Sequence, residues 1–287
     1  MQNTQDMIQR LNLSGGKLSK SHRRIAEYIL EHYDKAVFMT AAKLGEMVSV
    51  SESTVVRFAV ALGYEGYPQL QRSLQELVRH RLTATQRFEM SSDIDQSQVL
   101  STVLKADMQN IRSTIEGIDE KAFNDAVQAI SKSRRIYILG LRSAAPLAQF
   151  AGYYLHYIFD DVRVVAAGST DVFEFISRIE PGDVLLGISF PRYSTRTVEA
   201  MTFARSRSAQ VIGLTDGPMS PLHDVADICL SVSTDMASFV DSMAAPMSVI
   251  NALIVALGIQ NRDVLNARFK QLEEVWDAYS VYMNEGK

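Results

Sequence analysis

Cysteine is almost absent from this 287-residue chain, which contains a single one, Cys229. One cysteine excludes an internal disulfide and fits a reducing cytoplasm, where such bonds are rare. One cysteine and five scattered histidines also cannot supply the ligands of a structural zinc site, so no metal is expected. Because Cys229 lies in the apolar run ICLSVS, we interpret it as a buried thiol on a strand.

Long apolar segments are missing as well. The longest, AAPMSVINALIVALG over residues 244–258, contains a proline and is shorter than the ~20 residues that cross a bilayer. We interpret it as a buried helix. The polar start MQNTQDMIQR lacks the basic and then apolar pattern of a secretory signal. A cytoplasmic protein with no membrane partner is therefore expected.

Catalytic and cofactor motifs are equally scarce. The sequence has no Walker-type phosphate loop and no internal repeat. His156, His223 and Glu174 are the side chains that acid–base chemistry on a sugar would use. We interpret them as a histidine at the edge of the core, an exposed helix histidine and a solvated carboxylate, respectively. No catalytic residue and no cofactor are predicted.

Charge is present but unevenly distributed. The net charge is −4, yet residues 1–85 hold 11 Lys or Arg against 8 Asp or Glu, whereas residues 86–287 hold 18 against 25. A basic head on an acidic body indicates a nucleic-acid partner, although solvated helix faces produce the same imbalance.

The first part of the chain shows only helical periodicity. Apolar residues recur at i, i+3 and i+4 from about residue 19 to residue 82, and Gly63 is placed to end a helix as a left-handed cap. Three or four short helices are therefore predicted for an all-α head over residues 1–82. The three stripes are Ile25, Ile29 and Leu30; Leu44, Met47 and Val48; and Val55, Phe58, Ala59 and Leu62.

A polar linker and a second domain follow. TATQRFEMSSDIDQSQ, residues 83–98, has no sustained periodicity and is predicted to be the linker. Residues 99–287 begin with two helical stretches and continue with short apolar runs separated by helical patterns. Such runs predict a doubly wound α/β domain with a parallel sheet covered on both faces. The runs are RRIYILGL, VRVVAA, DVLLGISF, AQVIGLTD and ICLSVS.

The segment TAAKLGEMVSVSESTVVRFAVALGY has the spacing of a helix-turn-helix. It places Gly45 in a first short helix, Ser49 at the turn and Val55 inside a second helix. The outward face of the second helix then carries short hydroxyl side chains and one long cation, which suit base edges and phosphates in a major groove. A capped surface helix of a purely structural bundle is the alternative. The predicted DNA-binding residues are Ser51, Ser53, Thr54 and Arg57.

These residues resemble the RpiR family of bacterial transcriptional regulators. The core S-x-x-T-V-V-R-F and the following L-G-Y-x-G-Y are both present between residues 51 and 67. The resemblance implies that the second domain is a sugar isomerase (SIS) domain with five parallel strands in the order 2-1-3-4-5. It also implies a domain that senses a phosphosugar without converting it.

Two loops are predicted to bind the ligand, because in such a sheet ligands bind where the strand order reverses. GLRSAAP and SFPRYST each place hydroxyls and an arginine before a helix, where free N–H groups attract anions. The predicted ligand-binding residues are Arg142, Ser143, Ser189, Arg192 and Ser194, with Ser220 as a minor contributor.

Both loops depart from the glycine-rich SIS pattern. Arg142 and Ala144 stand where many SIS domains have a glycine and a serine, and Pro191 and Arg192 interrupt the second loop. A guanidinium binds phosphate or carboxylate bidentately, so side chains would here replace backbone N–H groups. The alternative is that both arginines form salt bridges across a subunit interface.

Three functions fit the sequence. The first is a transcriptional regulator that binds a double-stranded operator as a homodimer or higher oligomer and senses a small anionic effector, which the resemblance implies to be a sugar phosphate. The second is a sugar-phosphate isomerase with an accessory helical domain. The third, a metabolite-binding protein that never touches DNA, leaves the helix-turn-helix without a role. Apolar faces in AAPLAQFAGYYLHYIF and in residues 244–258 are the predicted dimer contacts.

Overall fold

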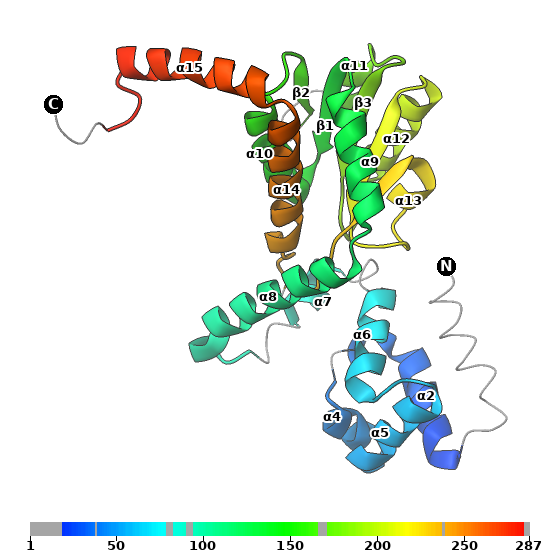
Figure 1. Ribbon diagram of the computed structural model, residues 1–287. Coiled ribbons are helices and arrows are strands. Elements are labelled where there is room, and N and C mark those ends of the chain that lie inside the picture. The colour runs from blue at the N-terminus through cyan, green and yellow to red at the C-terminus, as the bar shows by residue number, and fades with distance from the viewer. Residues whose placement is uncertain are drawn as a thin grey trace. The chain divides into compact units, whose positions relative to one another are not determined.

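The computed structural model describes residues 19–37, 39–78, 83–89, 94–165, 171–236 and 239–283. They fall into two units, one within Met1–Ile94 and one within Asp95–Lys287, and each unit is described by itself (Figure 1).

The first unit is entirely helical in its described residues. Its helices pack around one apolar core that includes Ile25, Ile29, Leu44, Phe58 and Leu70, all fully buried. Side-chain caps start three of the helices, since Ser19, Thr40 and Ser51 each accept a hydrogen bond from the backbone N–H three residues later. The helices are α2 (Lys20–Glu31), α3 (Tyr33–Ala36), α4 (Ala41–Met47), α5 (Glu52–Ala61), α6 (Tyr67–Val78) and α7 (Ala84–Glu89).

Two residues of the predicted apolar stripes lie outside this core. Leu30 is 44% exposed and Met47 is 48% exposed, although each lies three or four positions from a buried residue of the same helix. Each adjoins a buried residue in sequence, Ile29 and Val48, and adjacent helix positions point about 100° apart. The third stripe is confirmed in full, because Val55, Phe58, Ala59 and Leu62 are all buried.

The segment predicted as a linker contains helix. Helix α7 and the short 3₁₀ helix η2 (Gln96–Gln98) both lie within residues 83–98. Thr83 and Gln86 form a reciprocal capping box, in which the Gln86 N–H donates to Thr83 Oγ1 (3.2 Å) and the Thr83 N–H donates to Gln86 Oε1 (2.9 Å). The pattern T-x-x-Q was the signal for a helix start that the linker prediction missed.

The second unit is built on a five-stranded parallel sheet with the order β2-β1-β3-β4-β5, as predicted. Strand order reverses between β1 and β3, so the crevice at the reversal is bordered by the loops after these two strands. The strands are β1 (Arg135–Gly140), β2 (Val162–Val165), β3 (Asp183–Ile188), β4 (Gln210–Thr215) and β5 (Ile228–Ser231).

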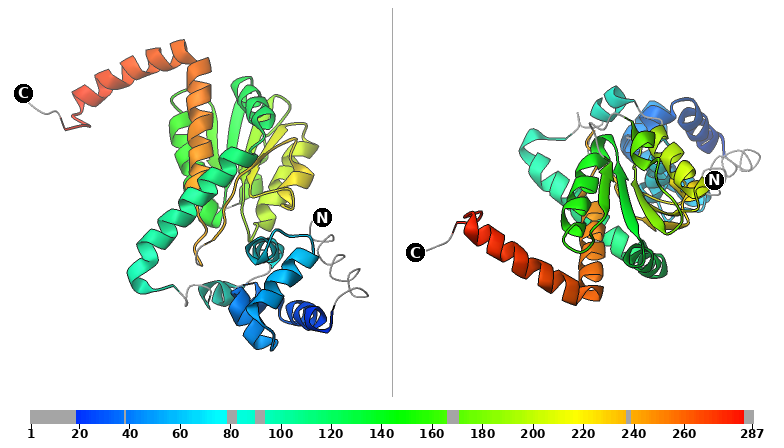
Figure 2. Two further views of the ribbon diagram at one scale, coloured as in Figure 1. Left: turned by 60° about the horizontal axis from the view of Figure 1, so that its bottom comes forward. Right: turned by 90° about the horizontal axis from the view of Figure 1, so that it is seen from above.

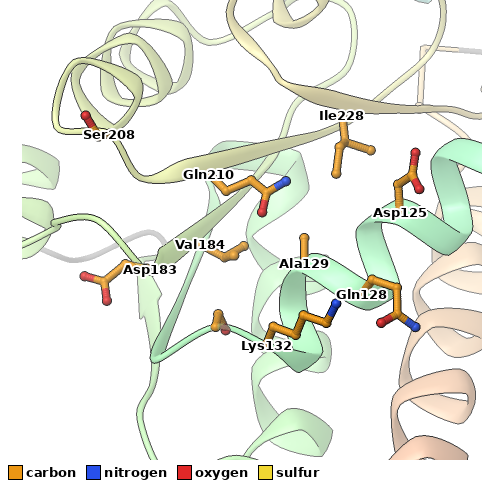
Figure 3. Close-up of a pocket in the computed structure, with 11 residues that line it drawn as sticks. Asp125, Gln128, Ala129, Lys132, Asp183, Val184, Ser208, Gln210 and Ile228 are labelled. Carbon is orange, nitrogen blue, oxygen red and sulfur yellow. The ribbon is translucent and has the colours of Figure 1, made fainter.

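The opposite, amino-terminal edge of the sheet carries a cavity of about 550 Å³. Its lining comes from helix α9 (Glu120–Ser131), from the turn after it, and from the starts of β3, β4 and β5 (Figure 3). Arg134 closes this edge with a salt bridge to the buried Asp183 (2.9 Å). The cavity therefore lies at the wrong end of the strands to be the predicted ligand crevice.

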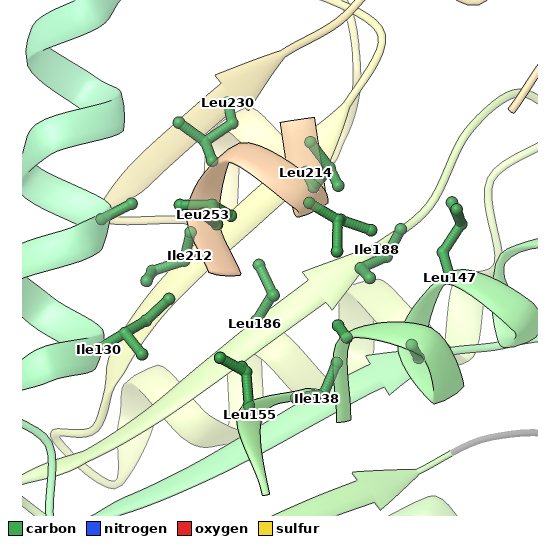
Figure 4. Close-up of a cluster of buried hydrophobic side chains, with 14 of the residues drawn as sticks. Ile130, Ile138, Leu147, Leu155, Leu186, Ile188, Ile212, Leu214, Leu230 and Leu253 are labelled. Atoms are coloured by element: carbon green, nitrogen blue, oxygen red, sulfur yellow. The ribbon is translucent and has the colours of Figure 1, made fainter. Parts of the chain in front are cut away.

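Strand residues alternate between two apolar layers, because successive side chains point to opposite faces. Ile138, Leu186 and Ile212 pack on one side against α9, α10 (Ala145–Leu155) and α14 (Ala244–Gln260) (Figure 4). Tyr137 and Leu185 pack on the other side against α11 (Val172–Ile176), α12 (Thr195–Ser206) and α13 (Leu222–Val225). Nearly every position of the central strands β1, β3 and β4 is buried, which explains their continuous apolar runs in the sequence.

Helix α8 (Val99–Gly117) is tied to the segment that follows β5. The buried Asn110 donates from Nδ2 to the Asp235 carbonyl (2.8 Å), and its Oδ1 accepts from the Asp235 N–H (2.8 Å) and the Ser233 hydroxyl (2.9 Å). The Ser233 N–H donates to Thr114 Oγ1 (2.9 Å), and the Ser242 hydroxyl donates to Asp107 Oδ1 (2.6 Å).

The last two helices meet at a sharp elbow, with α15 (Arg262–Ala278) bent by 98° from α14 (Figure 2). One face of α14 is buried, as predicted, and Val255 and Ile259 on its outer face are exposed. Among the described residues no single helix is long and apolar enough to cross a membrane. The bent α14–α15 pair passes that test by length and composition alone.

Candidate nucleic-acid interface and ligand crevice

Helices α4 and α5 cross with very little space between them. A Cβ on Gly45 would lie 2.8 Å from the Val50 carbonyl oxygen, so a larger residue would force the turn outward. Ser49 has φ = 54°, a left-handed conformation that reverses the chain between the two helices. The predicted helix-turn-helix geometry is therefore present, and Gly45 and Ser49 have the positions expected of them.

The start of α5 presents the four predicted DNA-binding residues together. Ser51 Oγ accepts from the Thr54 N–H (3.3 Å) and lies 3.0 Å from Ser53 Oγ and 2.8 Å from Thr54 Oγ1. Arg57 Nε donates to the Ser53 carbonyl (3.2 Å), which holds the guanidinium beside the hydroxyls. Ser51, Ser53 and Arg57 are exposed and Thr54 is half-buried. The arrangement offers short hydrogen-bonding groups and one cation on a single solvent-facing surface.

The sequence reasoning missed three neighbours of this surface. Val56 and Val60 are exposed one turn apart on α5, and Val60 is 54% exposed. Glu52, Val56 and Val60 are spaced four positions apart, and this spacing was the signal that they share one face of the helix. His22, at the start of α2, contacts Phe58 edge-on with ring centroids 5.6 Å apart. Burial, and secondarily the charge of Arg57, lower the pKa of His22.

At the strand-order reversal, two of the predicted ligand-binding residues, Ser189 and Ser194, are hydrogen-bonded to each other. Ser189 follows β3, is buried, and accepts on Oγ from the Ser194 N–H (3.1 Å). Ser194 is the N-cap of α12 and accepts on Oγ from the Thr197 N–H (3.4 Å). Free N–H groups at the start of this twelve-residue helix can bind an anion.

Thr197 is a residue of this loop that the sequence reasoning missed. Its Oγ1 is buried within the first turn of α12 and has no hydrogen-bond partner among the described residues. A buried polar atom without a partner costs free energy, which sets this hydroxyl apart from the other polar groups of the site.

The two predicted arginines are exposed. Arg142 lies in the short helix η3 (Arg142–Ala144) with φ = 57°, and Arg192 lies between β3 and α12. Neither guanidinium has an ion-pair partner within the described ranges, so both charges are available. A Cβ on Gly140, where β1 ends, would lie 2.5 Å from the Ala144 carbonyl oxygen, which requires glycine there. Ser143 is exposed beside Arg142.

Polar groups after β4 hold the neighbouring loop together. The Tyr193 hydroxyl donates to Asp216 Oδ1 (2.8 Å), which joins the loop after β3 to the loop after β4. The buried Ser220 lies 2.7 Å from Thr215 Oγ1 and accepts from the Leu222 N–H (3.2 Å). Ser220 is thus engaged in the fold, which leaves little capacity for the minor ligand contact predicted for it.

The groups weighed for acid–base catalysis have other surroundings. His156 is exposed, and its Nδ1 lies 2.9 Å from the Gly152 carbonyl oxygen. His223 is half-buried, and its Nε2 lies 3.1 Å from Ser231 Oγ. The expected burial of these two histidines is therefore reversed. Burial lowers the pKa of His223 although Asp216 opposes the shift. Glu174 is exposed, as predicted.

Cys229 lies on β5 and is half-buried. Burial, and secondarily the charge of Asp216, raise the pKa of its thiol to about 12. A thiol with so high a pKa is a poor nucleophile or metal ligand. Within the part of the chain that the structure describes, no three His, Cys, Asp or Glu side chains are grouped to hold a metal ion.

Comparison with known proteins agrees with both units. The model of the helix-turn-helix domain of the rpiR family matches residues 5–80, and the model of the SIS domain matches residues 129–256. The transcriptional regulator HexR of Pseudomonas aeruginosa is 26% identical over 276 residues, covering 94% of this chain and 95% of that protein. HexR of Escherichia coli is 24% identical over 278 residues, covering 94% and 93%.

Solved structures share the fold. The sugar isomerase domain of an RpiR transcription factor from Sphaerobacter thermophilus has 24% identity and a TM-score of 0.59, covering 62% of this chain and 99% of that one. The NanR protein of Vibrio vulnificus, solved with ManNAc-6P, has 20% identity and a TM-score of 0.59, covering 97% and 100%.

A helix-turn-helix unit joined to a five-stranded SIS unit defines a class of transcriptional regulators. Within that class, the chain belongs to the RpiR family. The family resemblance, the fold class and the regulatory function predicted from the sequence are thereby confirmed.

Proposed function

We propose that this regulator reads its operator with Ser51, Ser53, Thr54 and Arg57 and senses a phosphorylated sugar at Arg142, Ser143, Ser189, Arg192 and Ser194. The proposed DNA-binding head spans residues 1–82, and the SIS domain spans residues 99–287 after a linker over 83–98. The regulator acts in the cytoplasm, where operator DNA and phosphosugars are both present.

Operator binding is supported by the exposed polar face of α5. Its hydroxyls and its guanidinium lie on one surface, and Val56 adds a methyl-bearing contact for thymine. Phosphate contacts from the basic head set affinity, and the α5 side chains set sequence preference.

Phosphosugar sensing rests chiefly on one observation, the loop between β3 and α12. Ser189 and Ser194 are linked, α12 begins at Ser194, and Thr197 Oγ1 lacks a partner. Arg142 and Arg192 add two uncommitted positive charges that bind a phosphate dianion more tightly than a neutral sugar. The bound phosphosugar of the similar NanR protein supports the same class of ligand.

We infer that the chain does not catalyse isomerisation. A sugar isomerase needs a base beside the substrate carbon, and Glu174 is exposed on α11 while His156 lies at the far end of α10 from the loop after β1. The isomerase alternative predicts turnover of sugar phosphates, which an assay on the purified protein would detect.

A homodimer is proposed because one helix-turn-helix contacts only a short half-site, and two on a palindrome supply useful specificity. The outer faces of α10 and α14 are the proposed contact. Tyr153, Tyr154, Val255 and Ile259 on these faces are exposed.

The proposal is tested by titrating operator complexes with a panel of sugar phosphates and the corresponding free sugars. An active sugar phosphate should shift the complex for the parent protein, whereas its free sugar should not. Ser189→Ala and Arg192→Ala should each require at least ~10-fold more effector, because each removes a phosphate ligand. Basal operator binding should stay near that of the parent.

Arg207→Ala is the matched control, since Arg207 is an exposed arginine at the other end of α12. It should respond to effector as the parent does. If Ser189→Ala and Arg192→Ala kept the parent's effector affinity by calorimetry, the crevice between β1 and β3 would be excluded as the sensor.

A further inference from the structure

Helix α15 has no buried residue over its 17 positions. It leaves the body of the second unit at the 98° elbow after α14 and extends away from the sheet (Figures 1 and 2). Short isolated helices are marginal in water, so a helix of this length normally needs a packed apolar face. Near the elbow that packing comes from the ring contact of Phe269 with Tyr157 and the salt bridge of Arg268 to Asp160. The distal half has no such support from α10 or α14.

Four apolar residues of α15 and Tyr279, the residue that follows it, form a stripe with a four-three-four-three spacing. This spacing is the heptad pattern of a helix that packs along a second helix. The stripe is accessible, since Phe269 is 37% exposed and Tyr279 is 79% exposed. Its members are Leu265, Phe269, Leu272, Trp276 and Tyr279.

The stripe continues onto the body of the unit at the elbow. A cavity of about 420 Å³ lies between α10, α14 and α15, and its lining is almost entirely apolar. Tyr154, Tyr157, Ile259 and Phe269 are among the lining residues. One continuous apolar surface therefore runs from this cavity along the whole of α15.

The distribution of charge along α15 indicates which partner binds that surface. Residues 262–270 carry three basic side chains and one acidic one, whereas residues 271–279 carry three acidic side chains and no basic one. A second α15 running in the opposite direction would place each basic half against an acidic half, and opposed helix dipoles would add to the attraction. A parallel copy would place like charges together.

We propose that α15 pairs antiparallel with α15 of a second copy of this chain about a twofold axis. Apolar layers in antiparallel pairs combine unlike heptad positions. Overlap of α15 together with its C-cap residue, residues 262–279, places the axis between Lys270 and Gln271. Leu265 then faces Trp276 of the partner subunit, and Phe269 faces Leu272 of the partner subunit. The aromatic end of each helix covers the apolar cavity at the other elbow.

A lipid surface is the other occupant that an apolar helix face can have. Membrane-surface helices carry many basic residues on the polar face to meet anionic lipid. In α15 the acidic residues balance the basic ones and dominate the exposed distal half. A second copy of the chain is therefore favoured over a membrane.

Cysteine cross-linking tests the pairing in the full chain carrying Cys229→Ala. Leu265→Cys and Trp276→Cys chains, co-expressed with different tags, should form a mixed disulfide-linked dimer under mild oxidation. Each variant alone should not, because in the antiparallel pair the two copies of residue 265 lie about 16 Å apart, beyond disulfide reach. Self-linking of each variant without the mixed product would overturn the antiparallel arrangement.

Leu272→Glu and Gln271→Glu form a matched pair on α15 itself. Leu272→Glu, added to both cysteine variants, should abolish the mixed dimer, and Gln271→Glu should leave it intact. Trp276 is the only tryptophan of the chain, so its emission reports on the pair directly. Leu272→Glu alone should shift that emission to longer wavelength, while Gln271→Glu should not.

Two further results would overturn the pairing. One is the absence of the mixed dimer at every protein concentration while circular dichroism shows that the helix content is unchanged. The other is a shift of Trp276 emission on adding phosphatidylcholine–phosphatidylglycerol vesicles, with loss of the mixed dimer. The pairing does not depend on the effector or the operator, so its failure would leave the effector titration unaffected.

Discussion

At the start of α5, the hydroxyl of Ser51 caps the helix and also lies within hydrogen-bonding distance of the hydroxyls of Ser53 and Thr54. Ser51 Oγ thus caps the helix and also belongs to the polar surface. Arg57 extends this surface through its bond to the Ser53 carbonyl. Replacing Ser51 would disturb both stability and recognition, so Thr54 and Arg57 give a cleaner test of DNA binding.

Thr54→Ala and Arg57→Ala should each weaken operator binding by ~1–3 kcal/mol where a base contact is lost. Folding should hardly change, because Arg57 is exposed and the Thr54 backbone still donates to Ser51. Fluorescence anisotropy at fixed salt measures the affinity, and thermal unfolding checks the fold. Lys35→Ala, an exposed cation of α3, is the control. Parent-like affinity in both α5 variants would disprove the assignment of α5 as the recognition helix.

Elements differed in how well the sequence predicted them. The three central strands, β1, β3 and β4, were predicted because they are buried on both faces and leave continuous apolar runs, and the half-buried edge strands β2 and β5 leave shorter ones. Helix α7 was missed because it is short and carries no apolar stripe, and only its capping box marks it. The anchoring of α8 could not be predicted either, since Asn110 and Ser233 lie more than a hundred positions apart in the chain.

Helix α8 should depend on Asn110 for its attachment to the segment after β5. Asn110→Ala removes the three hydrogen bonds that this buried side chain makes to Ser233 and Asp235. The free energy of unfolding of the second unit should fall by about 1–3 kcal/mol or more. Denaturant titration followed by circular dichroism measures the change.

Gln109→Ala is the control for this experiment, since Gln109 is exposed and its side chain bonds only to the half-buried Ser113 among the described residues. Its effect should stay within ~0.5 kcal/mol. Equal stability of the Asn110 and Gln109 variants would show that the network does not hold α8.

At the scale of the whole molecule, the two units have separate cores. Phe58 is fully buried in the core of the first unit, and Leu186 is buried in the larger core of the second. Cores with no shared residues are expected to unfold as separate cooperative transitions.

Differential scanning calorimetry should therefore resolve two unfolding transitions. Phe58→Ala should lower the temperature of one, and Leu186→Ala should lower the temperature of the other, because each leaves a cavity that costs ~2–5 kcal/mol in its own unit. A single transition moved by both variants would show that the units unfold together.

The sequence alone determined the order of the five strands, the helix-turn-helix and the family, because these depend on local periodicity, capping residues and short motifs. Gly45, Ser49 and the α5 face follow from spacing over some twenty residues. The tertiary structure decided which residues meet across the chain. The link from Tyr193 to Asp216, the unpartnered Thr197 hydroxyl and the anchoring of Asn110 all depend on loops brought together by the sheet. The exposed stripe of α15 likewise became visible only once the elbow after α14 was known, since a helical period gives the spacing of apolar residues and not what covers them.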